Sequence, residues 1–273
     1  MFDDIRAEGR KLVRRPAIWT LLGVALALSL IFTYVVPYAG YAGGTGGPTA
    51  DRGLATMLPD RLVGNSIGGL PVFLGALMVI LGVLAVGSEY AWGTWKTVLT
   101  QDPARLRVYG AKLVVVVLAA LVGVLAVFAA GAAASALIAS AEGAAFDWPG
   151  IGDVLIGIGG GWLVAAMWTV FGAMLAIALR GVALPVGLGL VWLLAVQNLL
   201  TLIAAPLLDW VATMQKGLPG PNAGSLVAAL GAGADTPGVA ATVGGTQATL
   251  VLVAYVMAFA AVGGTLLRRR DIL

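Results

Sequence analysis

The sequence contains no cysteine and no histidine, and charged residues are scarce. Without cysteine the chain has no disulfide, thiolate nucleophile or thiolate metal ligand. Without histidine it lacks the most common general base, metal ligand and pH-sensitive side chain. Most hydrolytic chemistry is therefore disfavoured, and we expect neither a catalytic site nor a metal site on this chain.

Charged residues make up only 11% of the 273 residues, whereas an ordinary soluble domain has about 25%. Apolar residues make up 60% of the chain, and the mean hydropathy is +0.99. This composition excludes a soluble domain, and it excludes a disordered chain because disordered chains are poor in apolar residues. It predicts an all-α integral membrane protein.

Six apolar segments approach or exceed the roughly 20 residues that a helix needs to cross a bilayer. We expect spans at about Ala17–Tyr38, Leu70–Gly87, Leu106–Ala139, Val154–Leu179, Val182–Ala205 and Ala248–Leu267, forming one transmembrane domain over residues 1–273. The first run is longer than the 7–15 apolar residues of a signal peptide, which predicts a retained span. The connections at residues 39–69 and 206–247 are long, and the first is expected to be a glycine-rich loop.

The lysines and arginines predict the orientation, because cytosolic loops of membrane proteins are enriched in them. With the N-terminus and the C-terminus both inside, thirteen of the sixteen basic residues fall on the cytosolic side. Only Arg52, Arg61 and Lys216 fall outside. The basic character of the chain is thus a topology signal, and no nucleic-acid partner is expected.

The first sixteen residues predict an amphipathic helix lying in the lipid headgroup region, ahead of the first span. On a helical wheel Phe2, Ile5, Gly9, Leu12 and Val13 gather on one face. The basic residues of this elbow helix lie outside that face; they include Arg6, Arg10, Lys11 and Arg14. The alternative is a positively charged topology anchor with no further role.

The connection at residues 88–105 is the one cytosolic loop large enough to engage another protein. Trp92 and Trp95 share one side of a short helix that is expected to end near Gln101. Asp102 and Pro103 then form a helix start, because aspartate caps N-termini and proline fits the first helical position. We interpret the first part as a docking helix; the alternative is an interfacial belt of tryptophans.

The segments RAEGRKLVRRPAIWTLLG, GSEYAWGTWKTVLTQDPARLRVYGAKL and LLRRRDIL resemble the permease subunits of ABC-2 type exporters. The most specific part is E-Y-x-x-G-T followed by D-P-x-R-L and then Lys112-Leu113. The resemblance implies an interfacial elbow helix, a coupling helix at 88–105 and short external helices at 206–247. Gly9 departs from the family's unbroken helical opening and predicts a looser elbow. The residues expected to couple to the ATPase are Glu89, Tyr90, Trp92, Gly93, Thr94, Trp95, Lys96, Pro103 and Arg105, with Lys112 beside them.

The same resemblance implies a partner chain, because residues 1–273 contain no G-x-x-x-x-G-K-[ST] phosphate loop. ATP and Mg²⁺ are expected on a separate ABC ATPase subunit, in an assembly of two permeases and two ATPases. We expect a homodimer of permeases in a bacterial cell membrane, exporting a hydrophobic or amphipathic substrate such as a drug, a peptide or a lipid.

Glu89 is the only acidic residue between Phe73 and Gln101. We expect it to form charge-assisted hydrogen bonds with basic residues at the same membrane surface, for which the candidates are Arg10, Lys11, Arg14, Arg105 and Arg107. The alternative is a solvated carboxylate that merely offsets the positive charge nearby.

Polar groups inside the spans are few. Gln197 and Asn198 are candidates for a translocation path, although an interhelical hydrogen bond explains such amides equally well. Gly157 and Gly161 form a G-x-x-x-G pattern suited to close helix contact. An ATP-independent secondary carrier or channel is the alternative function, but ion-coupled carriers usually place charges near span centres. An enzyme embedded in the membrane would need paired carboxylates there, and the sequence offers none.

Overall fold

A computed structural model describes residues 2–43, 53–91, 93 and 105–269 of the chain. Within these residues it is built from helices and contains no strand. The helices before the bundle core are α1 (Phe2–Val13), α2 (Pro16–Leu30), η1 (Ile31–Val35), α3 (Val36–Gly43), η2 (Leu54–Thr56), η3 (Pro59–Arg61) and α4 (Leu62–Ile67). They are followed by α5 (Phe73–Ala91), α7 (Arg105–Glu142), α8 (Ile151–Leu179), α9 (Ala183–Leu190), η4 (Val191–Val196), α10 (Gln197–Leu199), η5 (Leu200–Ala204), α11 (Ala205–Leu207), α12 (Asp209–Met214), η6 (Gln215–Gly217), α13 (Pro219–Ala229) and α14 (Gly245–Arg269).

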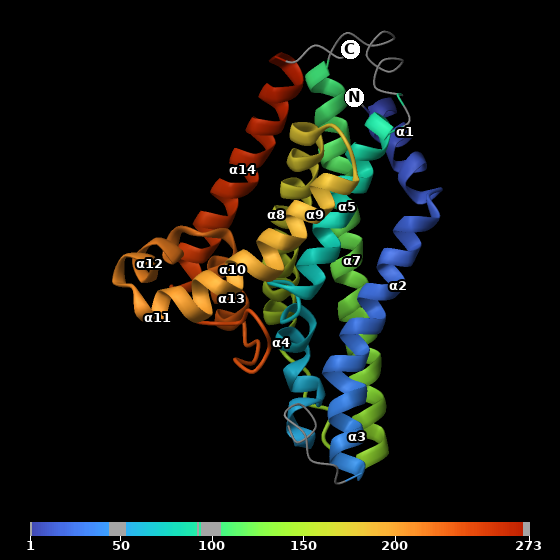
Figure 1. Cartoon of the computed structure of the whole chain (residues 1–273). Helices are drawn as coiled ribbons and strands as arrows, with labels where there is room; N and C mark the ends of the chain where they lie inside the picture. The colour runs from blue at the N-terminus through green and yellow to red at the C-terminus, as the bar shows by residue number, and fades with distance from the viewer. Residues whose placement is uncertain (1, 44–52, 92, 94–104, 270–273) are drawn as a thin grey trace.

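Six helical stretches in the described residues are long and apolar enough to cross a membrane, which confirms the predicted number of spans. They are Pro16–Gly43, Phe73–Ala91, Leu106–Glu142, Ile151–Leu179, Ala183–Leu207 and Gly245–Arg269. α1 and the last turns of α14 lie at the same end of the bundle, together with the end of α5 (Figure 1). This arrangement is what an even number of spans requires.

The second and third spans differ from their predicted ends. α5 begins at Phe73 rather than Leu70, because a turn containing Pro71 precedes it. It continues past Gly87 to Ala91, since Glu89 in its last turn is buried. α7 has 38 residues, about 57 Å at 1.5 Å per residue, and is thus longer than a bilayer core is thick, as predicted. It ends at Glu142, because the next residue, Gly143, has a φ of 62° that stops the helix.

α5 and α8 form the centre of the bundle, where their backbones touch. A Cβ added at Gly82 would lie 1.9 Å from the carbonyl oxygen of Thr169, and one at Gly172 would lie 2.2 Å from that of Val79. Only glycine permits this approach. In the most apolar stretch of each span, 72% of α5 and 61% of α8 is buried, against 11%, 17% and 22% of the first, fifth and sixth spans.

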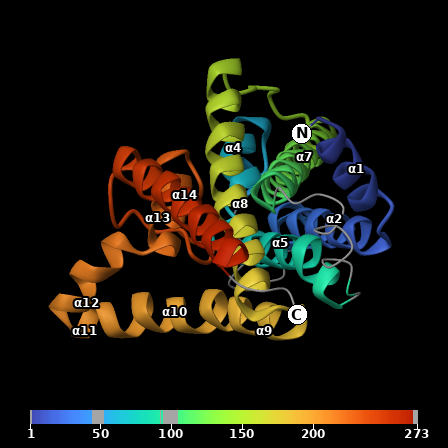
Figure 2. The same cartoon turned by 90° about the horizontal axis from the view of Figure 1, so that it is seen from above.

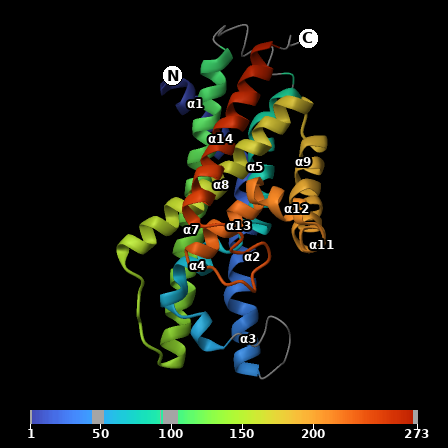
Figure 3. The same ribbon diagram turned by 90° about the vertical axis from the view of Figure 1, so that its left-hand side faces the viewer.

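The fifth span lies at the edge of the bundle, where its first part, α9, contacts α5 and α8. Figures 2 and 3 show α9 to α11 running along one edge of the molecule, away from α2 and α7. It starts at a tight turn in which Arg180 adopts a left-handed conformation with φ of 52°. Two π-helical segments, η4 and η5, interrupt it. Because only the turn at Arg180 separates α8 from α9, the predicted helical hairpin between spans four and five is confirmed.

The two long connections are more ordered than their composition predicts. The expectation of a plain glycine-rich loop at residues 39–69 is wrong, because this segment contains the end of α3 and the buried helix α4. The second connection contains α12 and the buried helix α13. The chain after α13 contacts α4 closely: a Cβ at Gly64 would lie 2.1 Å from the carbonyl oxygen of Gly231. Burial, rather than helix propensity, makes these glycine-rich segments helical.

The G-x-x-x-G pair of α8 packs against the same region. A Cβ at Gly157 would lie 2.5 Å from Val63, and one at Gly161 would lie 2.9 Å from Ile67. Both glycines thus let α8 approach α4, which confirms the close helix contact expected from their spacing.

Candidate functional site: a charged joint between three helices

Four charged side chains from three helices meet at the end of the bundle where α1 lies. Glu8 and Lys11 come from α1, Glu89 from the last turns of α5, and Lys112 from the second turn of α7. We call this group the charged joint. It contains two carboxylates and two ammonium groups, so its formal charges cancel.

Lys112 is the centre of the charged joint. Its Nζ donates hydrogen bonds to Oε1 of Glu89 and, at 2.5 Å, to Oε2 of Glu8. The side chains of Lys112 and Glu89 are 1% and 2% exposed. A buried ammonium or carboxylate is tolerated only when it is paired and hydrogen-bonded, so Lys112 holds the ends of α1 and α5 against α7.

Lys11 completes the charged joint on its open side. Its Nζ lies 2.6 Å from Oε1 of Glu8 and 3.6 Å from Oε1 of Glu89. Burial alone would raise the pKa of Glu8, but attraction to Lys112 and hydrogen bonds from Lys11 and Lys112 outweigh it and leave that pKa lowered. Burial alone would lower the pKa of Lys11, but its hydrogen bond and attraction to Glu8 leave it raised. Both groups are therefore held in their charged forms.

Further contacts fix α1 on both sides of the charged joint. The Arg15 guanidinium donates to the carbonyl oxygen of Leu84, at 2.9 Å, and to Oγ of Ser88, at 2.7 Å. Nε of Arg107 lies 3.4 Å from Oδ2 of Asp4. The apolar face of α1 also docks, because Leu12 packs with Ala85, Val115 and Val116 on α5 and α7.

The helix predicted for the N-terminal segment is present as α1, which runs unbroken through Gly9 from Phe2 to Val13. The looser elbow expected from Gly9 stays a prediction. Arg6, Arg10 and Arg14 are exposed, away from the charged joint. That α1 lies in the lipid headgroup region, and that both termini are cytosolic, stay predictions.

The predicted coupling residues are only partly described. Glu89 is buried in the charged joint, Tyr90 is half-buried next to it, and Gly93 forms an exposed turn with φ of 65°. Trp92, Thr94, Trp95, Lys96 and Pro103 lie outside the described residues, and so does the side chain of Arg105. The docking helix expected at 88–101 stays a prediction.

The structure identifies which basic residues contact Glu89. Of the five candidates, Lys11 lies 3.6 Å away, and Lys112, which was not among them, donates a hydrogen bond. The expectation of a partly buried, paired carboxylate is met, and the alternative of a solvated carboxylate is wrong because Glu89 is 2% exposed. The signal that could have found Lys112 is its isolation: it is a single lysine at the start of an apolar run.

Gln197 and Asn198 do not share one environment. Gln197 is buried against α13, where a Cβ at Gly220 would lie 1.8 Å from its side-chain amide. Asn198 is half-exposed and donates to the carbonyl oxygen of Leu194 within its own helix, at 2.9 Å. Gln197 thus connects the fifth span to the segment that follows it. Participation of either residue in a translocation path stays a prediction.

The charged joint pairs two carboxylates with two ammonium groups. The sequence was also compared with known proteins. No curated protein matches it. A family model described as "ABC-2 family transporter protein" matches residues 5–218, a range that includes the charged joint and the first five spans. With most of the chain matched and six spanning helices, this multi-pass membrane protein belongs to the ABC-2 family of transporters.

Proposed function

We propose that this chain is the membrane permease of an ATP-driven exporter, and that the charged joint transmits motion from a separate ATPase subunit. The observation that carries the proposal is the burial of Glu89 against Lys112, directly before the segment expected to dock onto the ATPase. Displacement of that segment moves the end of α5. Because Lys112 binds both Glu89 and Glu8, α7 and α1 move with it.

Several further features support an assembly of two permeases and two ATPases. The sequence lacks a phosphate loop, so ATP and Mg²⁺ belong to the partner. Most of the fifth and sixth spans is not buried by the rest of the chain. Their exposed apolar surface is available for contact with a second copy. The scarcity of charged side chains in the spans favours a hydrophobic or amphipathic cargo such as a drug, a peptide or a lipid.

The test is the Glu89→Gln variant, reconstituted with its ATPase, with hydrolysis and flux measured on one sample. Glutamine keeps the size of the side chain but removes the charge that holds Lys112. The expected result is normal complex assembly with a severalfold lower ratio of flux to ATP hydrolysed. Glu142→Gln, an exposed glutamate at the opposite end of α7, is the matched control and keeps the wild-type ratio.

An unchanged ratio in Glu89→Gln would contradict the coupling role of the charged joint. Substrate flux through the pure permease, without ATPase or ATP, would instead support the ATP-independent carrier or channel. The first result tests the coupling role of the charged joint, and the second tests whether transport depends on ATP.

A further inference from the structure

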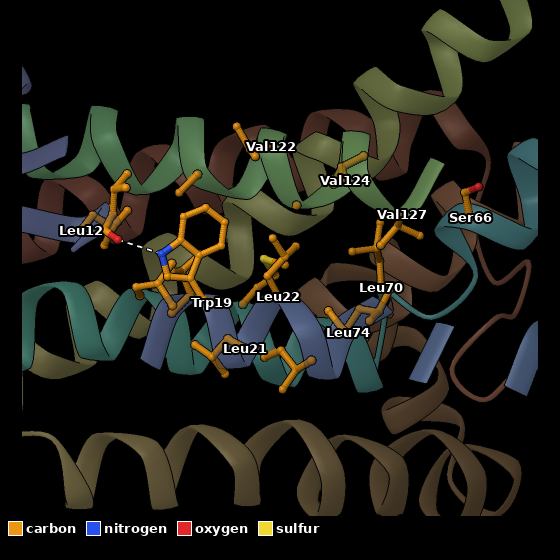
Figure 4. A pocket seen from close by; sticks show the side chains of 18 residues that line it. Leu12, Trp19, Leu21, Leu22, Ser66, Leu70, Leu74, Val122, Val124 and Val127 are labelled. Carbon is orange, nitrogen blue, oxygen red and sulfur yellow. Dashed lines mark hydrogen bonds between the residues drawn. The ribbon is translucent and has the colours of Figure 1, made fainter. Parts of the chain in front are cut away.

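An apolar cavity of about 170 Å³ lies between part of the first span and the rest of the bundle. Its walls are formed by α2, α5 and α7, as Figure 4 shows, and include Leu22, Met78 and Val127. Among the described residues lining it, Ser66 at one end carries the only side-chain hydroxyl. An engineered apolar cavity of about 150 Å³ stays dry and binds benzene. A hydrocarbon group is therefore the natural occupant, and water is not.

The cavity opens toward the bilayer. Trp19 of α2 and Val122 of α7 both line it, and each is 58% exposed. On membrane-spanning helices such exposed apolar side chains contact lipid. Along α7 the lining extends from Ala119 to Val127, which is about 12 Å at 1.5 Å per residue. That length is close to the roughly 15 Å of one leaflet's hydrocarbon, so an acyl chain can enter from the side and lie along the groove.

One end of the cavity lies beneath α1. Leu12 and Val13 close this end, and the indole N–H of Trp19 donates to the carbonyl oxygen of Val13 at 2.8 Å. Arg10 of α1 and Arg14, in the turn directly after α1, are exposed and lie close in sequence to these residues.

Of the three acidic residues of α1, two are engaged by other basic residues. The third, Asp3, lies in the first turn, about 10 Å from Arg10 along the helix axis. Glu8 is engaged by Lys112, and Asp4 pairs with Arg107. The exposed surface at this end of the cavity therefore carries positive charge, which favours an anionic headgroup. Each basic residue near a membrane surface attracts anionic lipid with about 1 kcal/mol.

We propose that the cavity is a binding site for one acyl chain of an anionic phospholipid, whose headgroup lies at Arg10 and Arg14. The lipid comes from the leaflet that α1 contacts. It fills the space that keeps α2 away from α5 and thereby supports the position of α1. This binding is independent of the transport function proposed above.

The experiment uses tryptophan quenching by brominated lipids in vesicles that contain the full-length permease. Brominated phosphatidylglycerol and brominated phosphatidylcholine are compared at equal mole fractions in unlabelled phosphatidylcholine. The signal from the cavity is the difference between the wild-type protein and Trp19→Phe. We expect Trp19 to be half-quenched at a fraction of the anionic lipid that is lower by about fivefold for each arginine that contacts the headgroup, because each basic contact contributes about 1 kcal/mol. Arg10→Gln combined with Arg14→Gln should remove this preference.

Gly123→Leu tests the cavity itself. A Cβ at Gly123 meets only the terminal methyl of Met78, at 3.5 Å, so the leucine can extend into the cavity. We expect this variant to lose the preference of Trp19 for the anionic lipid. Gly110→Leu is the matched control on the same helix, because nothing lies within 4 Å of a Cβ there, and it should keep the preference.

Equal quenching of wild-type Trp19 by the two lipids would overturn the proposal, since it indicates ordinary boundary lipid. An unchanged preference in Gly123→Leu would overturn it as well, because the headgroup attraction would then operate without the cavity. If Gly123→Leu does not fold, Ala119→Leu replaces it, because Ala119 lines the same wall of the cavity. Loss of the preference for the anionic lipid would again support the proposal, and an unchanged preference would overturn it.

Discussion

Lys112 on α7 and Glu89 on α5 are buried against each other, although 23 residues separate them in the sequence. The same ammonium group also binds Glu8, so one side chain joins α1, α5 and α7. An isolated buried pair often contributes little net stability. Its removal is a different matter, because each charge left behind stays in an apolar setting. The predictions below begin with that asymmetry.

Replacing Lys112 alone should destabilise the protein more than replacing Lys112 and Glu89 together. Lys112→Met leaves Glu8 and Glu89 without their buried ammonium partner, with the half-exposed Lys11 beside them. The expected cost is about 3–5 kcal/mol. Adding Glu89→Gln to Lys112→Met should restore part of this stability, because one of the two stranded charges is removed. Thermal unfolding midpoints in detergent measure both effects. Lys216→Met, at an exposed lysine, should stay within about 0.5 kcal/mol of wild type. Strict additivity of the two substitutions would contradict a shared charged joint.

The docking of α1 should be independent of pH over a wide range and should weaken in acid. The pKa of Glu8 is lowered from its ordinary value of 4.5, so its contribution is present above pH 4.5 and is lost as the pH falls through the lower folded value. The pKa of Lys11 is raised from 10.5, so its contribution is present below pH 10.5 and is lost only as the pH rises beyond that.

An environment-sensitive dye on Ala7→Cys would report this docking. Its spectrum should be constant between those two limits and should change as the pH falls below 4.5. In a Glu8→Gln background the acid change attributable to Glu8 should disappear. A transition centred near neutral pH would be inconsistent with the directions of both pKa shifts.

Close packing of α5 on α8 should make Gly82 intolerant of any side chain. Gly82→Ala places a Cβ 1.9 Å from the carbonyl oxygen of Thr169, so the helices must separate. The expected loss is about 1–3 kcal/mol, seen as a lower unfolding midpoint and a smaller monodisperse fraction. Gly159→Ala on α8 meets nothing within 4 Å. Alanine there should stabilise the helix by about 0.5–1 kcal/mol. Equal effects at the two glycines would argue against backbone contact.

The predicted orientation can be tested because the chain has no cysteine of its own. Ala145→Cys, in the exposed connection between α7 and α8, should react with a membrane-impermeant thiol reagent on intact cells. Ala7→Cys, exposed on α1, should react only after the membrane is permeabilised. Labelling of Ala7→Cys on intact cells would reverse the topology.

The six spans could be predicted from sequence because each is a continuous apolar run, and length alone identifies them. The pairing of Glu89 with a basic residue could also be expected, since a lone carboxylate followed by a basic loop needs compensation. The identity of that residue could not be. Which lysine faces Glu89 depends on the rotation of α7 about its axis, and apolarity on all sides of a membrane helix gives no periodic signal for that rotation.

The residue types of α4 and α13 do not by themselves predict helices, although the family resemblance implied short helices at 206–247, where α13 lies. Gly64 and Gly68 lie in and after α4, and Pro219, Gly220 and Gly224 lie in α13. These residue types have low helix propensity. Their helices form because the surrounding chain buries them: the backbone N–H groups of Thr242 and Val243 both donate to Oγ of Ser225 in α13. Such support becomes visible only when the tertiary contacts are known.

The glycine contacts between α5 and α8 also determine how a force would travel through this protein. Where two backbones touch, no layer of long side chains remains that could rearrange and absorb a displacement. α5, with 19 residues and a length of about 28 Å, must then tilt together with α8. A displacement of α5 at Glu89 would therefore be transmitted almost undiminished to the other end of the helix, where Trp168 of α8 lies against Gly75 of α5. α5 and α8 would then move as one rigid body. The loosely packed first, fifth and sixth spans would be the helices that change position relative to that pair.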